Sequence, residues 1–389
     1  MPKMTINDPN LRFPEKFALI EDLDVFEMPD GLGLQLRGGA TNLVIRGQLA
    51  NTLTPWLLGE IKQQTTLENL INSRPANSNA GQIEELLLLL LRKGCLVDLT
   101  ANDCSKNSTP QNENAEGRLE ARQRLFWGRK LGFTRNNASA QEIERKLSEA
   151  RVVLVADGLL GCCAFDILHR SGINKIDVVD RFNNCDLMQL VEDASNSGIQ
   201  ACYCNAETLD TLAQVLESKV ETSDLLITVT RNAPPSFFNL INTIALETPI
   251  EWLRANETAV ELEIGPLVIA HDTACYCCYE LRARSASEHP IEETLYLQHL
   301  ETLPNADPKP MLGESLAFAT AGGANIAMEA IRALTKISLP VTLGAVVFNS
   351  FDGHTEQMKV KKVARCPACY RGTIEVKGET QRQRNSAYA

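Results

Sequence analysis

Several hallmarks of membrane, secreted and nucleic-acid-binding proteins are missing from this 389-residue sequence. No apolar run reaches the roughly 18–20 residues that a membrane-spanning helix needs. The longest run, Leu86–Leu91, predicts a buried helix instead. The amino-terminal stretch MPKMTINDPN lacks the apolar segment of a secretory signal, so we expect a cytoplasmic protein. The formal net charge of −11 disfavours nucleic acid as the main partner, because phosphate binding needs a basic surface.

Familiar catalytic patterns are missing as well. No Ser/His/Asp order and no pair of carboxylates at a catalytic spacing stands out along the chain. His169, His271, His289 and His354 lie in no motif that pairs them with a nucleophile, so we expect them to be structural or exposed. The chain does contain twelve cysteines, which in a cytoplasmic protein favour metal ligands or core residues over disulfides.

Four of these cysteines form two C-x-x-C pairs near the carboxyl end. Cys275 and Cys278 make the first pair, and Cys366 and Cys369 make the second. Two turns that each supply two thiolates can close a tetrahedral zinc site, and such a site has no open position for catalysis. The sequence therefore predicts a structural zinc ion; a redox dithiol, with one thiol of depressed pKa, is the alternative. Cys277, inside the first pair, is expected to be a partly buried bystander.

Residues 1–100 predict a separate N-terminal domain. Periodicity indicates strands at 24–28, 32–37 and 42–46 and helices at 49–61, 67–72 and 80–93. Three strands with three helices suggest a winged helix-turn-helix. Nine basic against twelve acidic residues, with Gln82, Glu84 and Glu85 in the third helix, disfavour DNA recognition by a winged-helix transcription factor. Peptide binding by strand addition to the edge of the sheet is the better interpretation.

A polar, turn-rich stretch at 101–117 indicates a linker to a larger α/β domain, 118–376, and the polar end, 377–389, is expected to be disordered. The larger domain is organised around 151–180. There the β-branched run Val152–Val155 meets a glycine turn, followed by a helix and a second apolar strand that ends on Asp180. Strand, helix and strand in this order predict one unit of a nucleotide-binding parallel sheet.

The glycine turn is an incomplete form of the nucleotide-binding fingerprint. The usual pattern is G-x-G-x-x-G, and here Ala156 or Asp157 replaces the first glycine, depending on register. The candidate nucleotide-binding residues of this unit are Asp157, Gly158, Gly161 and Asp180.

From about Leu119 to Arg371 the chain resembles the ThiF fold of ubiquitin-activating-type adenylating enzymes. The matching segments are Glu120–Gln123, 151–180, Ile264–Cys278, Gly322–Leu334 and Cys366–Cys369. The resemblance implies a Rossmann-type α/β domain with a four-cysteine zinc site and a homodimer formed through the helix at 322–334. It also implies that Arg122 could reach a nucleotide across that dimer.

The chain departs from active members of this family where they handle ATP and Mg²⁺. Neither the Arg-Gln pair nor the downstream Lys of the family is evident after Asp180. Arg231-Asn232 stands where the family's magnesium-binding Asp is expected, and a guanidinium cannot bind Mg²⁺. We therefore interpret the nucleotide pocket as vestigial.

Residues 1–100 resemble the precursor-peptide recognition element of peptide-modifying enzymes. The whole chain is similar to the ThiF-like, leader-binding component of thiazole/oxazole-modified microcin cyclodehydratases. This implies a scaffold that presents the leader of a ribosomal peptide to an ATP-using YcaO-type partner, which forms azolines from Cys, Ser or Thr. The predicted leader contacts are Asn42, Leu43, Val44, Ile45, Arg46, Ile83, Leu86, Leu87 and Leu90.

The alternative is a stand-alone, ATP-dependent adenylating enzyme of the ThiF family that modifies a precursor peptide itself. Such an enzyme would need a carboxylate for Mg²⁺, and Asp157, Asp180 or Asp186 would have to supply it.

Overall fold

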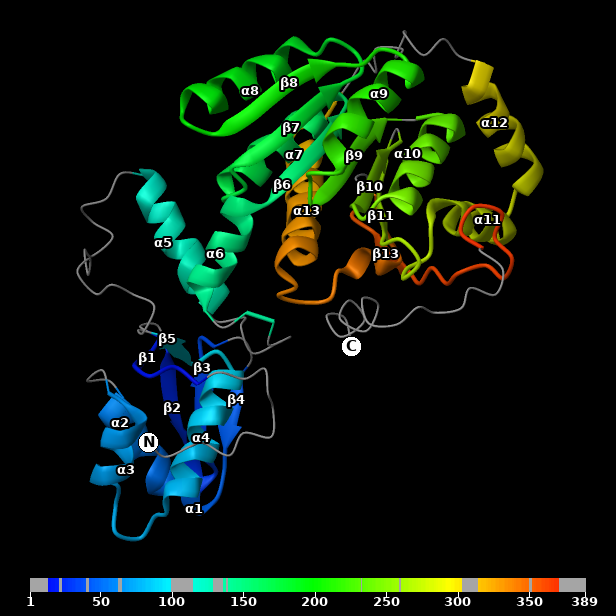
Figure 1. Ribbon diagram of the computed structural model, residues 1–389. Coiled ribbons are helices and arrows are strands. Elements are labelled where there is room, and N and C mark those ends of the chain that lie inside the picture. Colours follow the sequence, from blue (N-terminus) through cyan, green and yellow to red (C-terminus); the bar gives the residue numbers. More distant parts are fainter. Residues whose placement is uncertain are drawn as a thin grey trace. The chain divides into compact units, whose positions relative to one another are not determined.

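The computed structural model divides the chain into two compact units, Met1–Arg145 and Lys146–Ala389 (Figure 1). Each unit has its own hydrophobic core. The residues that the structure describes are 13–20, 23–39, 42–61, 65–98, 115–128, 136–137, 139–231, 233–258, 260–302, 314–349 and 352–370. Residues 101–114 of the predicted linker and the predicted disordered end, 377–389, lie outside them.

The first unit contains a three-stranded antiparallel sheet in the order β2–β3–β4. Its elements are β2 (Asp24–Met28), the short 3-10 turn η1 (Pro29–Gly31), β3 (Gly33–Arg37) and β4 (Leu43–Ile45). A second pair, which the sequence pattern did not predict, joins β1 (Phe17–Leu19) to β5 (Leu96–Asp98). β4 pairs with β3 on one side, and no other described strand lies on its second side.

Four helices lie between β4 and β5 in the sequence of this unit: α1 (Gln48–Asn51), α2 (Leu53–Ile61), α3 (Leu67–Ser73) and α4 (Ala80–Arg92). The last two begin at side chains that bind free backbone N–H groups. Thr66 accepts a hydrogen bond from the Asn69 N–H, and Asn79 forms a reciprocal capping box with Gln82. The predicted single helix at 49–61 is divided into α1 and α2. After β5 come α5 (Ala115–Gly128) and α6 (Ala140–Glu149).

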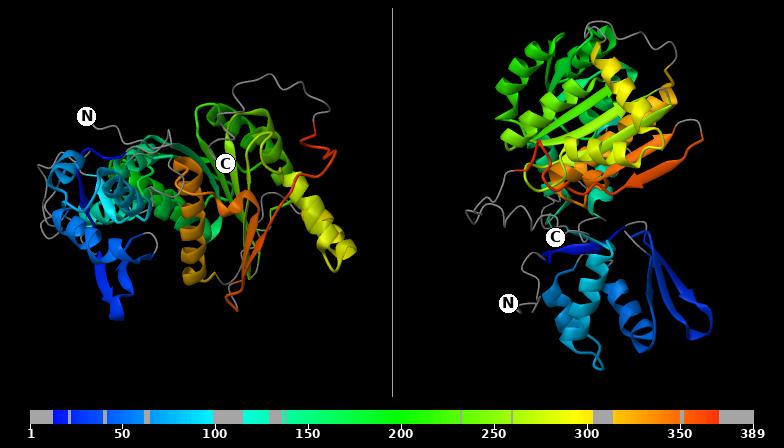
Figure 2. Two further views of the ribbon diagram at one scale, coloured as in Figure 1. Left: turned by 90° about the horizontal axis from the view of Figure 1, so that it is seen from below. Right: turned by 90° about the vertical axis from the view of Figure 1, so that its right-hand side faces the viewer.

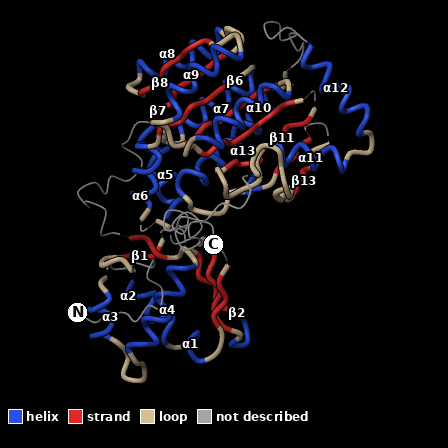
Figure 3. The backbone as a smooth tube through the Cα atoms, turned by 45° about the vertical axis from the view of Figure 1, so that its right-hand side comes forward, coloured by secondary structure: helices blue, strands red, loops and turns tan. Residues whose placement is uncertain are grey.

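The second unit is organised around an eight-stranded sheet in the order β13–β12–β11–β10–β9–β6–β7–β8 (Figure 3). The strands are β6 (Arg151–Ala156), β7 (Lys175–Asp180), β8 (Gln200–Asn205), β9 (Leu225–Arg231), β10 (Glu251–Glu257), β11 (Glu261–Val268), β12 (Ala345–Asn349) and β13 (Thr355–Met358). The five strands from β8 to β10 are parallel, whereas β11, β12 and β13 are antiparallel. The hairpin of β12 and β13 forms one edge of the sheet (Figure 2).

Helices cover both faces of this sheet, which explains why its central strands read as continuous apolar runs (Figure 1). The helices are α7 (Gly158–Arg170), α8 (Cys185–Asn196), α9 (Leu209–Val220), α10 (Pro235–Glu247), α11 (Tyr276–Ala286), α12 (Pro290–Thr302) and α13 (Leu316–Thr335), and a 3-10 turn, η3 (Val341–Leu343), precedes β12. None of the helices in the described part of the chain is long and apolar enough to cross a membrane.

Small residues let α13 lie directly on α7. A Cβ at Gly323 would meet the backbone of Ala164 and Cys163 at 2.9 Å, and one at Gly322 would meet Leu262 and Leu160 at under 3 Å. α13 therefore packs closely on α7 within the second unit. A homodimer through this helix stays a prediction.

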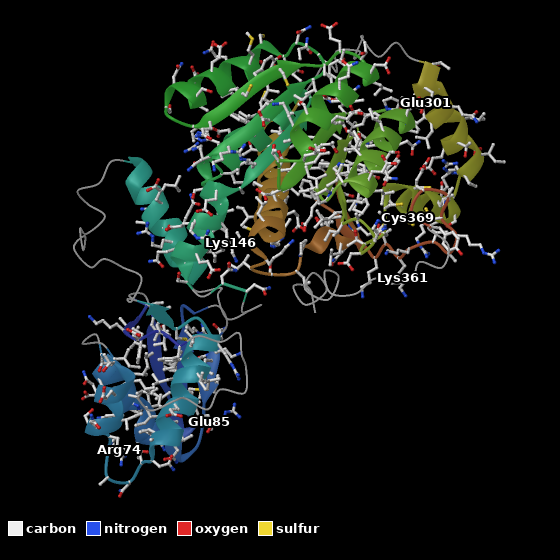
Figure 4. The ribbon with its side chains drawn as sticks, viewed as in Figure 1. Arg74, Glu85, Lys146, Glu301, Lys361 and Cys369 are labelled. Atoms are coloured by element: carbon white, nitrogen blue, oxygen red, sulfur yellow. The ribbon has the colours of Figure 1, made fainter. Side chains whose placement is uncertain are left out.

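A surface helix follows α11. Pro290–Thr302 forms α12, in which only Leu300 is buried. Pro290 is its first residue, a position where the missing N–H and the fixed φ of proline are tolerated. The far end of α12 contacts α10, where the Ser236 N–H donates to Glu301 Oε1 at 2.6 Å (Figure 4).

Candidate functional site

The strand-to-helix turn from β6 into α7 is tighter than a glycine-rich loop. Asp157 is the only residue between them, and its N–H donates to the Val229 carbonyl on β9 at 2.8 Å. Gly158 has a left-handed φ of +63°, which favours glycine. A Cβ at Gly161 would lie 2.9 Å from that of Ala156, so this glycine lets α7 approach β6. Both glycines therefore have structural reasons to be present.

The Asp157 carboxylate is buried behind the start of α7. It lies 3.6 Å from the guanidinium of Arg181, which is also buried and stacks on the rings of Phe182 and Phe237. Burial raises the pKa of Asp157 to about 6, and the Arg181 charge opposes that shift. Asp157 is therefore enclosed by protein at the position where the predicted ligand would lie.

Asp180, at the end of β7, is fully buried and bound by protein donors. Its Oδ1 accepts from the Phe182 N–H at 2.9 Å, and its Oδ2 accepts from the Asn184 N–H and the Tyr203 hydroxyl, both at 2.5 Å. Three donors from the protein occupy both oxygens. This candidate nucleotide-binding carboxylate therefore faces the protein interior.

Arg231 ends β9 and pairs with two carboxylates. It lies 3.4 Å from Glu257, which ends β10, and forms a second ion pair with Glu314 just before α13. Glu314 also accepts a hydrogen bond from the Leu159 N–H at 3.3 Å, so its carboxylate lies at the amino terminus of α7. Burial raises the pKa of Glu257, and the Arg231 charge opposes that rise. The Glu314 carboxylate thus lies at the amino terminus of α7, which is the kind of position where a helix can bind a phosphate.

The carboxyl edge of the parallel strands is where ligands bind in open α/β sheets. Six charged residues near this edge have a protein partner in an ion pair or hydrogen bond: the carboxylates Asp157, Asp180, Glu257 and Glu314 and the guanidinium groups Arg181 and Arg231. The formal balance of these six is −2. A polyphosphate would meet net negative charge at this edge. The sequence pattern did not identify Glu257, Glu314 or Tyr203 as parts of this arrangement.

Arg122 lies elsewhere in the chain. It is an exposed residue of α5, in the unit Met1–Arg145, whereas Asp157 and Asp180 belong to the second unit. A role for Arg122 toward a nucleotide stays a prediction.

The predicted peptide contacts divide into an exposed and a buried group. Val44 of β4 and the flanking Asn42 and Arg46 are exposed, whereas Leu43 and Ile45 of β4 are buried in the core of the first unit. The helix residues Ile83, Leu86, Leu87 and Leu90 are buried in the same core. The structure therefore brings Leu43 and Ile45 together with the α4 residues as a packed interior, beneath the unpaired edge of β4.

The four predicted metal ligands do converge. Cys275 Sγ lies 3.7 Å from Cys366 Sγ, Cys278 Sγ lies 3.6 Å from Cys369 Sγ, and all four sulfur atoms lie within 4.8 Å of one another. A tetrahedron of Zn–S bonds of about 2.3 Å has edges of about 3.8 Å, so the thiols fit such an ion. Cys277 is half-buried and is not part of this cluster.

Local structure holds both C-x-x-C turns in place. Cys275 caps α11, which sets Cys278 one helical turn later, and the Asn242 amide oxygen accepts from the Tyr276 N–H at 3.0 Å. Arg254, buried beneath α11, lies over the rings of Phe238, Tyr276 and Tyr279. The Val363 N–H points at Cys278 Sγ from 3.2 Å. Four close thiols on rigid supports favour a metal site over a redox dithiol, which would need only the two thiols of one turn.

Comparison with known proteins identifies the fold. No family model matches the chain, and no curated protein does. Among solved structures, Escherichia coli MccB matches with a TM-score of 0.67 and 16% identity, over 94% of this chain and 99% of MccB. MccB in complex with N-formylated MccA matches with 0.66 and 16%, over 91% and 100%, and MccB with ATP matches with 0.64 and 15%, over 91% and 99%.

A heterocyclase in complex with substrate and cofactor is a second kind of match. Its TM-score is 0.53 at 16% identity, over 91% of this chain but 39% of the heterocyclase. The likeness to MccB spans both units of this chain, and at these identities it establishes the fold. The predicted ThiF-like fold is confirmed: this chain has the fold of MccB, a microcin C7 biosynthetic enzyme.

Proposed function

We propose that this chain is a leader-binding scaffold subunit of a complex that modifies a ribosomally made peptide. Its N-terminal unit, a winged helix-turn-helix in this proposal, takes the leader of the precursor peptide as an added strand. Its ThiF-like unit forms a homodimer, holds a structural zinc ion and docks an ATP-using YcaO-type partner. That partner forms azolines from Cys, Ser or Thr side chains of the bound peptide.

The observation that carries the scaffold role is the ion-pair cluster around Arg231. At the edge where an adenylating enzyme needs a free carboxylate for Mg²⁺, this chain has a guanidinium bound by Glu257 and Glu314. Of the three carboxylates that could replace the magnesium ligand, Asp157 and Asp180 are buried and paired, whereas Asp186 is exposed in the first turn of α8. Adenylyl transfer needs concentrated positive charge, and the six paired residues near this edge have a formal balance of −2.

The free edge of β4 supports the peptide-binding part. Its backbone groups on one side have no described partner, and its outward side chains, Asn42, Val44 and Arg46, carry no acidic group. Strand addition to such an edge supplies main-chain hydrogen bonds, and alternate side chains then set specificity. Because Ile83, Leu86, Leu87 and Leu90 are in the core, a peptide would contact the half-buried side chains beside them, among them Leu88 and Leu91.

The solved relatives are consistent with a peptide ligand. MccB was crystallised with N-formylated MccA, and the heterocyclase was solved with its substrate. The structure of MccB with ATP keeps the alternative, an adenylating enzyme that acts alone, as a second candidate.

Two sets of measurements test the proposal. A fluorescent leader peptide from a cognate precursor should bind the full chain, and deletion of residues 1–100 should abolish binding and azoline formation by the YcaO-type partner. Calorimetry with ATP and Mg²⁺ should show no heat, and ATP–pyrophosphate exchange should be absent. Exchange activity in the purified chain would establish the adenylating enzyme instead. If leader binding and cyclisation both survived the deletion of residues 1–100, the scaffold role would be overturned.

A further inference from the structure

The surface beside the thiol cluster has a charge opposite to that of the whole chain. From Lys359 to Tyr370 there are four basic residues and no acidic one, in a protein whose formal net charge is −11. Lys359, Lys361, Lys362 and Arg365 are all exposed. Arg282 of α11 extends the same patch, because its guanidinium donates to the carbonyls of Lys361, at 2.5 Å, and Lys362, at 3.0 Å. We call these five residues the basic patch.

Two of the five cations have a structural role. Arg282 ties the segment to α11, and Lys362 Nζ donates to the His271 carbonyl at 2.5 Å. The other three, Lys359, Lys361 and Arg365, have no ion pair or side-chain hydrogen bond with any residue that the structure describes. Their charge is therefore available to a partner.

Balancing the thiol cluster does not account for the patch. A divalent ion with four thiolates has a formal charge of −2, which the two structural cations already match. The three remaining cations are in excess. Figure 4 shows Lys361 and Cys369 in the same region of the second unit, with Lys361 directed outward.

Exposed apolar groups accompany these charges. Tyr370, directly after the second C-x-x-C turn, is 57% exposed, and Leu281, next to Arg282 on α11, is 38% exposed. Tyrosine and arginine are enriched among the residues that dominate protein–protein binding energy. Without the five cations the formal net charge would be −16, so the rest of the chain repels the kind of partner that this patch attracts.

We infer that the basic patch is a docking surface for a protein partner that presents a carboxylate-rich segment. Complementary charge brings the partner to this patch, and contact with Tyr370 and Leu281 adds apolar burial. A protein segment is favoured over nucleic acid because three free cations in a strongly acidic chain make a small footprint for a phosphate backbone. The basic patch belongs to the second compact unit, whereas the β4 edge proposed for the leader belongs to the first.

The test uses the full, metal-loaded chain and two fluorescein-labelled probes, a poly-glutamate peptide and a DNA duplex. Poly-glutamate should bind, with an affinity that falls as salt rises. Lys359→Glu/Lys361→Glu should weaken this binding by about tenfold or more, because two attractive charges become repulsive. Arg74→Glu/Arg170→Glu is the matched control, because it changes the net charge equally at exposed positions elsewhere. Its affinity for poly-glutamate should stay within about twofold of that of the parent chain.

Three readouts decide the outcome. Both variants should retain zinc and the leader affinity of the parent chain, which separates this proposal from the scaffold function. An equal loss of poly-glutamate affinity in both variants would show attraction by the overall charge of the chain and would overturn the docking role of the basic patch. If DNA bound more tightly than poly-glutamate and Lys359→Glu/Lys361→Glu weakened DNA binding, the proposal of a protein partner would be overturned in favour of nucleic acid.

Discussion

Arg231 and Glu257 are register partners at the carboxyl ends of β9 and β10, and their charged groups lie 3.4 Å apart. Their neighbouring positions follow from parallel pairing of two strands that are 20 residues apart in sequence. The pair converts a ligand-binding edge into an internal contact, because the guanidinium also holds Glu314 at the start of α7.

Arg231→Ala should destabilise the second unit. The substitution leaves the Glu257 and Glu314 carboxylates without their counter-ion in a largely buried place, where loss of one partner costs about 2–4 kcal/mol. Urea denaturation monitored by tryptophan fluorescence measures the free energy of unfolding. The control is Arg170→Ala, which removes an exposed ion pair with Asp166 and should cost at most about 0.5 kcal/mol. Equal costs for the two variants would contradict the internal role of Arg231.

Asp180→Asn should cost about 2–3 kcal/mol, because the amide nitrogen of Asn cannot accept the hydrogen bonds now made to one carboxylate oxygen. Tyr203→Phe removes one of the three donors and should cost about 1 kcal/mol. The two effects should be non-additive in a double-mutant cycle, since both changes act on the same hydrogen bond. Unchanged stability in Asp180→Asn, together with altered nucleotide affinity, would instead assign Asp180 to a ligand.

The buried Asp157 makes stability depend on pH in a defined direction. Its folded-state pKa of about 6 is above the unfolded value of about 3.9, so the folded protein binds the proton more tightly. The stabilisation is complete below about pH 4 and is lost as the pH rises through 6. Relative to Asp157→Asn, the free energy of unfolding of the parent chain should fall by about 2–3 kcal/mol from pH 4 to pH 7. A constant difference across this range would show that the pKa is not raised.

The amino-acid pattern predicted the elements that have an intrinsic periodicity, and missed those defined by distant contacts. β6 and β7 are apolar runs, and α3 and α4 have capping residues at their start. β10 was not predicted, because Arg254, Asn256 and Glu257 interrupt its apolar pattern although all three are buried. Their polar groups are compensated by partners on other strands, and no local signal identifies those partners.

The same distinction applies to the candidate sites. The cysteine spacing predicted the metal cluster, because a C-x-x-C turn places two thiols on one ion by local geometry alone. Sequence reasoning found Arg231 as an anomaly, but not the partners that explain it. Glu314 is 83 residues away and reaches Arg231 only through the packing of α13 on α7. Long-range pairing of this kind has no sequence periodicity to reveal it.

The thiol cluster offers the sharpest comparison within the chain, because Cys277 lies between two of its members. Cys278→Ser and Cys366→Ser should each lose the metal, since a three-thiolate remnant cannot close the tetrahedron. Structural zinc contributes about 10 kcal/mol or more to folding, so α11 and the segment 359–370 should become sensitive to protease. Cys277→Ser should retain one zinc ion and resist cleavage, because its thiol is outside the cluster. Elemental analysis and limited proteolysis read out both effects, and loss of metal in all three variants alike would place Cys277 among the ligands.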